Sequence, residues 1–155
     1  MKKLLLAYLL LGFIASNSAA NPLIVKTNSP GYVHPDYSRS EICNLYVDRV
    51  EIKRTYGRAA ESSFNVNQVI PLTISSELPN ILAKANGEGL QSDEVFICDA
   101  PSTSIVVNLE DKAVTLFNSG GCGSPRLERV GRFSSMLVDL INQYCPKTYD
   151  FHVNN

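Results

Sequence analysis

The sequence predicts an α+β domain with a mostly antiparallel sheet of about five strands, one short helix, one long C-terminal helix and two disulfides. Three observations predict it. Short runs rich in β-branched and aromatic residues occur in five places, and two other segments repeat apolar residues at helical spacing. Four cysteines, Cys43, Cys98, Cys122 and Cys145, are spread through the chain without any CxxC pair. The order of these runs favours helices packed on one face of the sheet.

The first twenty residues have the layout of a secretory signal peptide. Lys2 and Lys3 precede an apolar run from Leu4 to Ala15, and small residues end the segment at Ala20. About 20 apolar residues are needed to cross a bilayer, so this run is too short for a membrane anchor. We therefore expect cleavage after Ala20, a periplasmic or secreted protein, and no stable membrane anchor after cleavage.

The remaining 135 residues are enough for one domain. Without the signal segment, 12 lysines and arginines stand against 15 acidic residues, a net charge of −3. A nucleic-acid-binding surface needs a positive excess, so this class of partner is not expected. Residues 21–42 contain three prolines and scattered apolar residues, which predicts an extended, partly flexible lead-in. We expect the folded domain over 43–146 and a C-terminal tail over 147–155.

Within that domain, alternating residues predict one long strand over 43–56, with a bulge near Asp48 and Arg49. A second strand over 64–74 contains Pro71, which confines it to a sheet edge or a break. A short helix is expected from Ser76, its cap, to Gly87. Three further strands are predicted over the ranges 95–98, 104–109 and 112–117.

The longest predicted helix opens at Ser124-Pro125 and ends at Cys145-Pro146. A cap residue followed by proline is typical of a helix start, and the apolar side chains from Leu127 to Tyr144 fall within one arc of the helix. One face of this helix is expected to be buried against the sheet.

In an oxidising compartment, an even number of distant cysteines indicates disulfides, with three possible pairings. Zinc or thiol-redox sites are disfavoured because the two nearest cysteines are 23 positions apart. If the last three strands alternate in direction, Cys98 and Cys122 meet at one end of the sheet. The long helix then returns Cys145 towards Cys43. The topology thus favours the pairs Cys98–Cys122 and Cys43–Cys145.

The most suggestive candidate site is the glycine-rich segment 118–124, because a glycine loop at a helix start exposes backbone N–H groups to an anion. The alternative is that the glycines serve only turn geometry and that the arginines after them are solvated. On this prediction, alanine at both arginines weakens anion binding and leaves the melting temperature nearly unchanged. The predicted anion- or partner-binding residues are Gly120, Gly121, Gly123, Ser124, Arg126 and Arg129.

Catalytic signals are weak. The two histidines, His34 and His152, fall in the lead-in and the tail, where nothing rigid is expected to position a general base. No GxSxG or HExxH motif occurs, and no metal or cofactor site is predicted. A carboxylate pair drawn from Asp93, Glu94 and Asp99 remains a candidate for acid–base work.

Tyrosine is a softer signal, because it is enriched in protein-binding surfaces. After cleavage the chain keeps six of these residues: Tyr32, Tyr37, Tyr46, Tyr56, Tyr144 and Tyr149. We therefore expect an exported, non-enzymatic binding module for a protein partner, of the inhibitor or immunity type. The alternative is a small envelope hydrolase that uses carboxylates or the glycine-rich loop.

Overall fold

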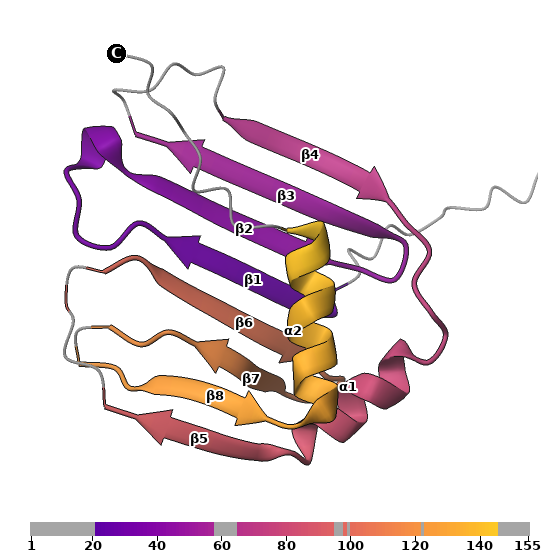
Figure 1. The fold of residues 1–155 in the computed structure, drawn as a ribbon. Helices are drawn as coiled ribbons and strands as arrows, with labels where there is room; N and C mark the ends of the chain where they lie inside the picture. Colours follow the sequence, from indigo (N-terminus) through magenta and orange to yellow (C-terminus); the bar gives the residue numbers. More distant parts are fainter. Residues whose placement is uncertain (1–20, 58–64, 95–97, 99, 122, 146–155) are drawn as a thin grey trace, which may run out of the picture.

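The computed structural model describes residues 21–57, 65–94, 98, 100–121 and 123–145. In this part of the chain, one eight-stranded antiparallel sheet carries two helices on one face (Figure 1). The elements in chain order are β1 (Ile24–Ser29), the 3₁₀ turn η1 (Pro35–Tyr37), β2 (Arg39–Leu45), β3 (Arg49–Tyr56), β4 (Val66–Pro71), α1 (Leu78–Asn86), β5 (Gly89–Asp93), β6 (Ser102–Asn108), β7 (Ala113–Asn118), β8 (Arg126–Val130) and α2 (Arg132–Tyr144). Their order across the sheet is β4-β3-β2-β1-β6-β7-β8-β5.

The prediction of about five strands is wrong, and one of the two predicted disulfides lies among the described residues. The sheet has eight strands, and the structure describes one disulfide, Cys43–Cys145. Cys122, the predicted partner of Cys98, lies outside the described residues, as does most of the strand predicted over 95–98. The short helix, the two strands that follow Ser102, and the edge position of the strand containing Pro71 are confirmed.

The segment expected to be an extended lead-in contains a central strand. β1 pairs with β2 on one side and with β6 on the other, and so joins the two halves of the sheet. Its core-facing side carries Ile24 and then Lys26, which is fully buried. The Lys26 ammonium donates to the Cys145 carbonyl (2.6 Å) and to the Asn142 side-chain oxygen (2.9 Å). A hydrophobic pattern does not reveal this strand, because a charged residue occupies a core position and two of its partners, Asn142 and Cys145, lie more than 100 residues away in the sequence.

The single strand predicted over 43–56 is in fact two strands, β2 and β3. The expected bulge near Asp48 is a tight turn, in which the Tyr46 backbone N–H donates to the Arg49 carbonyl (2.8 Å). Leu45 pairs directly with Val50, and both side chains are buried in the core. A bulge and a reversal both shift the alternation by one residue, so the pattern alone does not separate them.

The long C-terminal helix is shorter than predicted. Residues Arg126–Val130 form β8, which pairs with β7 and β5, and α2 begins only at Arg132. Gly131 separates the two elements. Glycine inside a helix costs about 1 kcal/mol relative to alanine, so a break at this position is favourable when strand pairing competes. The competing strand, β5, was not predicted, because its five residues are all exposed and none is β-branched.

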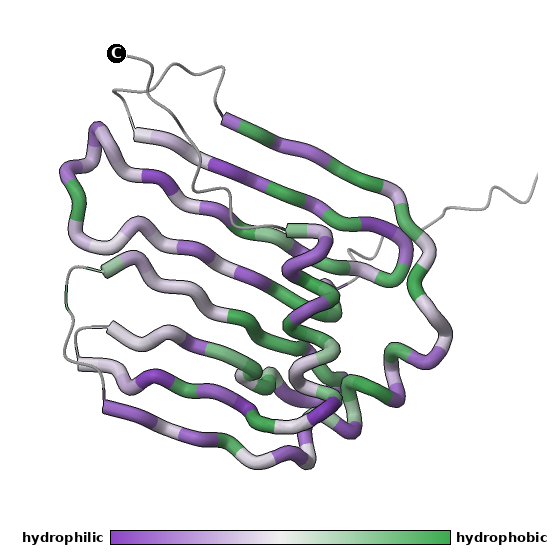
Figure 2. Tube along the Cα trace, in the orientation of Figure 1, coloured by the Kyte–Doolittle hydropathy of each residue, from purple (hydrophilic) through white to green (hydrophobic). Residues whose placement is uncertain are grey.

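The two ends of the sheet differ in character. Both helices connect to the strands at one end, whereas the β1–β2 and β7–β8 loops lie at the other, which we call the loop end (Figure 1). Figure 2 shows that the hydrophobic stretches of the central strands lie under α2 and that their hydrophilic stretches point to the loop end. The core therefore occupies the helix-covered half of one face. No helix among the described residues is long and apolar enough to cross a membrane.

The Cys43–Cys145 disulfide joins the middle of β2 to the end of α2, with 6.3 Å between the α-carbons. It is the pairing that the strand directions favoured. Both cysteines are fully buried, next to Lys26, the residue that pairs with Cys43 across β1 and β2. The bond closes a loop of 102 residues, and on the loop-entropy model such a bond stabilises a domain by about 4–5 kcal/mol.

We predict that the double variant Cys43→Ala, Cys145→Ala loses about 3–5 kcal/mol of unfolding free energy, because its unfolded chain is no longer constrained. Urea unfolding of the oxidised wild type and the variant measures this difference. The matched control is Met136→Ala, which removes an exposed side chain from the same helix. Equal midpoints for wild type and double variant, or alkylation of Cys43 and Cys145 in the native protein, would show that the disulfide does not hold the fold.

Candidate functional site

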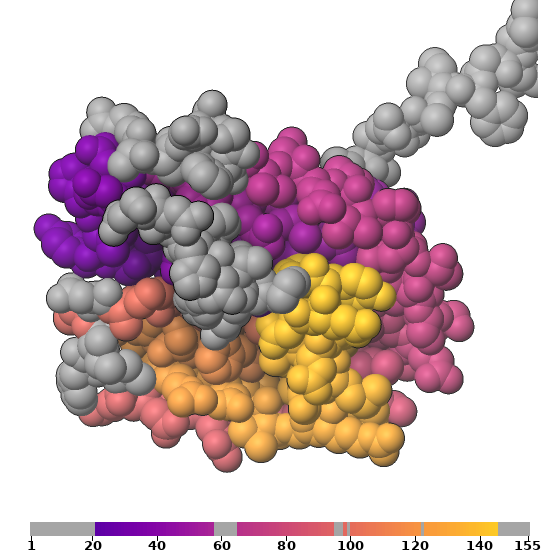
Figure 3. Space-filling model, turned by 45° about the horizontal axis from the view of Figure 1, so that its top comes forward, coloured from indigo at the N-terminus to yellow at the C-terminus, as the bar shows by residue number. Residues whose placement is uncertain are grey.

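The β1–β2 loop at the loop end exposes two aromatic side chains. Tyr32 is 87% exposed and Tyr37 is 76% exposed, the largest values among the exposed large hydrophobic residues of the described chain. Val33, between them, is also exposed. Figure 3 shows this part of the chain, coloured indigo to purple, at the margin of the molecule and away from α2. Packing of the core does not account for several exposed apolar side chains on one short loop, and such a cluster is typical of a binding surface.

Local hydrogen bonds hold the loop in one shape. The Tyr37 backbone N–H donates to the His34 carbonyl (2.9 Å), and the Asp36 N–H donates to Nδ1 of His34 (3.3 Å). The Ser38 hydroxyl donates to the Pro35 carbonyl (2.8 Å). Gly57, at the end of β3, packs directly beneath η1, where any β-carbon would overlap the backbone of Pro35 and Asp36. Tyr37 therefore projects from a turn that these contacts hold, and Tyr32 lies two residues before His34, where that turn begins.

A network of buried polar side chains ties together the strands that carry this loop. Glu41 on β2 accepts hydrogen bonds from the Arg54 guanidinium and from the Asn28 amide (3.1 Å), and Asn28 accepts one from the Thr103 hydroxyl (2.9 Å). Glu41 and Thr103 are each 6% exposed. The chain of contacts crosses β3, β2, β1 and β6. Nearby, partial burial raises the pKa of Tyr56. A satisfied network of this kind rigidifies the loop end.

A shallow polar hollow of about 360 Å³ lies beside the start of the β1–β2 loop. It is formed where the end of β1, the start of β6 and the β7–β8 turn meet. Its lining consists of Ser29, Pro30, Gly31, Cys98, Ala100, Ser102, Asn118, Gly120, Gly121 and Ser124. We call this feature the loop-end hollow; all of its lining residues are small or uncharged.

Three of the residues predicted for anion or partner binding, Gly120, Gly121 and Ser124, line this hollow, whereas Gly123 is exposed in the adjoining turn. The geometric reason for an anion site is wrong, however, because the turn leads into β8 and not into a helix. Gly121 and Ser124 exchange backbone hydrogen bonds (3.1 and 3.0 Å), and the Gly120 N–H donates to the Asn118 side chain (2.9 Å). Their N–H groups are thus already used within the turn.

The two predicted arginines do different things. Arg126 is half-exposed, pairs with Glu128 (2.7 Å) and lies over the Phe117 ring. Arg129 points its guanidinium at three backbone carbonyls: Thr115 (3.2 Å), Asn86 (3.1 Å) and Glu88. These contacts join the end of α1 to the second half of the sheet, so Arg129 is a structural clamp.

Glu88, which follows α1, caps the start of α2. Its carboxylate accepts hydrogen bonds from the backbone N–H groups of Phe133 (2.8 Å) and Ser134 (2.7 Å) and from the Ser134 hydroxyl. Burial raises the pKa of Glu88, but these hydrogen bonds and the nearby Arg129 outweigh that effect and hold the pKa below its ordinary value of 4.5. A β-carbon at Gly131 would overlap the Glu88 carboxylate, so a larger residue at this position would displace the cap.

The residues considered for catalysis are not assembled into a site in the described part of the chain. His34 sits on the exposed loop, 3.6 Å from Asp36, and His152 lies outside the described residues. Asp93 ends β5 and Glu94 follows it, both exposed, whereas Asp99 also lies outside the described residues. Among the described side chains, no group of three His, Cys, Asp or Glu residues is placed to hold a metal ion.

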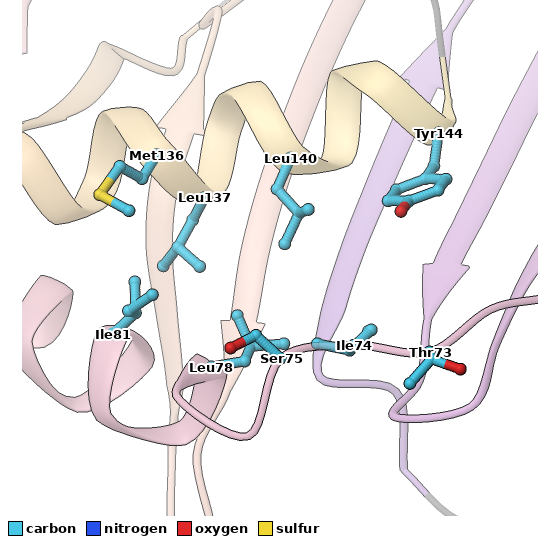
Figure 4. A pocket seen from close by; sticks show the side chains of 9 residues that line it. All are labelled: Thr73, Ile74, Ser75, Leu78, Ile81, Met136, Leu137, Leu140 and Tyr144. Carbon is cyan, nitrogen blue, oxygen red and sulfur yellow. The ribbon is translucent and has the colours of Figure 1, made fainter.

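A second, apolar depression of about 200 Å³ lies between α1, α2 and the segment before α1. Figure 4 shows Met136, Leu137, Leu140 and Tyr144 of α2 pointing across it towards Ile81 and Ile74. Leu137 and its neighbour Leu78 belong to the buried core. This depression is the incompletely filled seam of the helix layer.

The sequence indicates that tyrosines could contribute to a binding surface, but it does not show which of them are exposed. Tyr46 is buried and Tyr144 lines the helix seam, whereas Tyr149 lies outside the described residues. The signal that distinguishes Tyr32 and Tyr37 is their context. Each stands in a proline- and glycine-rich segment without alternating apolar neighbours, the composition of a surface loop.

The clamp predicts that Arg126 and Arg129 respond differently to substitution, unlike the sequence-based expectation that neither affects stability. Arg129→Ala should lower the free energy of unfolding by about 2–3 kcal/mol, because three carbonyls lose a charged donor. Arg126→Ala, the matched control, should change it by less than about 0.5 kcal/mol, since an exposed ion pair contributes little. Parallel urea titrations compare them, and equal losses in both variants would remove the clamp assignment.

The Glu88 cap predicts a pH dependence with a definite sign. A carboxyl whose folded pKa is lowered contributes stability above its unfolded pKa and loses it as the pH falls through the folded value. We expect that contribution, about 1–2 kcal/mol, to disappear below about pH 4.5 in the wild type. Glu88→Gln should be less stable at pH 7, and its stability should fall less on acidification. Urea unfolding from pH 7 to 3 measures both curves; parallel curves with a constant offset would refute the proton-linked cap.

Comparison of the chain with protein-family models, with curated proteins and with solved structures finds no match. The function of the site must therefore be inferred from its exposed side chains and their surroundings. That chemistry is a rigid loop with two exposed tyrosines beside an uncharged hollow, on the end of the sheet away from both helices.

Proposed function

We propose that this protein is an exported, non-enzymatic binding module that engages a protein partner through its loop end. The observation that carries the proposal is the exposure of Tyr32 and Tyr37 on one short loop, whose residues 34–38 are joined by hydrogen bonds. Tyrosine contributes large contact areas at low entropic cost, and it is enriched among the residues that dominate binding energy. A pre-organised loop also avoids the cost of ordering on association.

The composition of the surrounding surface supports a protein partner. Antibody CDR loops, which are selected to bind other molecules, are rich in Tyr, Ser, Gly and Asn. The β1–β2 loop contributes Gly31 and both tyrosines, and the β7–β8 turn contributes Asn118, Ser119 and three glycines. The buried network around Glu41 fixes the strands beneath both segments.

Export is supported by chemistry and by the sequence. The Cys43–Cys145 disulfide is compatible with an oxidising extracellular compartment. The cationic start and short apolar run of residues 1–20 have the layout of a signal peptide. We propose a periplasmic or secreted location on these grounds, and an inhibitor or immunity-type role, because a rigid projecting loop is suited to occupying a partner's cleft.

The test is capture of a partner from the extracytoplasmic fraction of the producing cells, with wild type and variants immobilised at equal density. Tyr32→Ala with Tyr37→Ala should lower the affinity at least ~30-fold, the effect expected when one or two dominant contact residues are removed. The double variant should keep the wild-type unfolding midpoint, because both rings lie in water. The matched control is Val47→Ala with Val69→Ala, two exposed apolar residues away from the loop, which should bind like the wild type.

A second variant separates the geometry of the loop from its chemistry. Gly57→Ala keeps both tyrosines but forces the backbone at Pro35 and Asp36 to move. It should weaken capture at least ~10-fold, since the rings leave their pre-organised positions. If no protein is captured saturably by the wild type, or if the tyrosine variant captures it equally well, the proposal is refuted.

A further inference from the structure

We infer that His34 is a proton-sensitive switch in the β1–β2 loop, through which mild acidification weakens binding of the partner. This inference rests on the proposed function and assigns the regulation of the same site. His34 directly precedes the 3₁₀ turn η1 and lies between the two exposed tyrosines, Tyr32 and Tyr37, in the sequence. A change of charge at this side chain therefore acts in the middle of the proposed binding loop.

One ring nitrogen of His34 faces two groups that require opposite protonation states. Nδ1 accepts a hydrogen bond from the Asp36 backbone N–H (3.3 Å), which it can do only when it carries no proton. The same Nδ1 lies 3.6 Å from Oδ2 of Asp36, a contact that becomes an ion pair only when the ring is protonated. Protonation of Nδ1 therefore exchanges the first contact for the second.

The contact that protonation removes belongs to the turn that carries Tyr37. The His34 side chain caps η1 through the Asp36 N–H, and the His34 carbonyl accepts from the Tyr37 N–H (2.9 Å). The rings of His34 and Tyr37 are also neighbours, with centroids 6.1 Å apart. Protonation takes this acceptor from the Asp36 N–H and draws the imidazole towards the carboxylate. Both the cap of the turn and the ring beside Tyr37 then change.

The other charged groups around the turn do not titrate in the same range. The turn packs on Gly57 at the end of β3, and Arg39 on β2 pairs with Tyr56 on β3 beside it. Arg58 follows Gly57 in the sequence and lies outside the described residues. Arginines stay charged, and burial raises the pKa of Tyr56 above its ordinary value of 10. Within this set, histidine is the residue type that takes up a proton between about pH 8 and pH 5.

The unprotonated form is the one that binds, because it presents Tyr37 with both hydrogen bonds of the turn in place. The His34 side chain is 65% exposed, so the pH of the surroundings sets its protonation directly. Loss of one turn hydrogen bond changes the population of a loop shape several-fold. We therefore expect the dissociation constant of the partner to rise ~3–10-fold between about pH 7.5 and about pH 5.5.

Backbone amide NMR spectra of the full oxidised protein test the exchange of contacts without a partner. Between about pH 7.5 and about pH 5.5, the resonances of Asp36 and Tyr37 should move with the same midpoint as the His34 ring, while the amides of α1 stay in place. His34→Asn keeps a side-chain acceptor but takes up no proton, so both movements should vanish. His152→Gln, the matched change at the other histidine, should keep them. Stationary amides in the wild type, or moving amides in His34→Asn, would overturn the inference.

Capture of the partner at the two pH values tests the consequence for binding. The dissociation constant of His34→Asn should agree between the two pH values to within about twofold, since no proton is taken up. His34→Lys places a permanent cation there and should bind as weakly at about pH 7.5 as the wild type does at about pH 5.5. Equal pH dependence in the wild type and His34→Asn would overturn the inference.

The two measurements separate this inference from the proposed function. Amide titration together with capture that does not depend on pH would refute the switch and leave the proposed function standing. Saturable capture at neither pH would refute the proposed function and the regulation of binding with it. In that case, the amide titration would still establish or exclude the exchange of contacts at His34.

Discussion

Helix α2 is fixed to the sheet at both of its ends, and the rest of the architecture depends on this attachment. At its start, Glu88 satisfies the free backbone N–H groups of the first turn. At its end, the Cys43–Cys145 disulfide and the buried Lys26 tie Cys145, which directly follows the helix, to β2 and β1. The helix therefore covers one half of one face, and the core forms beneath it. The loop end lies outside this layer and is free to carry function.

The division into a helix-covered half and a loop end separates stability from recognition. Apolar burial, the disulfide and the Arg129 clamp lie on the helix side of the molecule. The loop end is stabilised by the hydrogen bonds of the Glu41 network, by the hydrogen bonds of the turns and by the close packing of Gly57 against η1. These contacts restrain the loop backbone without burying its tyrosines. Exposed rings on a fixed backbone bind a partner with little loss of conformational entropy.

The sequence predicted what local patterns determine. The α1 helix and strands β6 and β7 alternate or repeat with the right period over their own length, and the predicted edge strand carries Pro71. β1 and β5 were missed because their stability is non-local. Lys26 interrupts the apolar alternation of β1 and donates hydrogen bonds to Asn142 and Cys145, which are distant in the sequence, and β5 is held by its pairing with β8. The helical spacing continued through β8 because Leu127 and Val130 also fit a 3.6-residue period, and Gly131 was the only local sign of a break.

The candidate site was also predicted only in part. Glycines and serines of the segment 118–124 were predicted for binding, and three of the six predicted residues line the hollow. The arginines were assigned to the same site because a helix was expected there, and the strand places Arg129 against backbone carbonyls instead. No sequence pattern shows that residues 29–31 lie beside residues 118–124, since only the order of strands across the sheet brings them together.

Hydrogen–deuterium exchange on the captured complex would show whether recognition occurs at the loop end. Complex formation should slow exchange in the β1–β2 loop and the β7–β8 turn, while amides in α1, α2 and the strands beneath them should exchange at unchanged rates. Protection concentrated on the two helices, or on β4 at the far edge of the sheet, would show that the partner binds elsewhere.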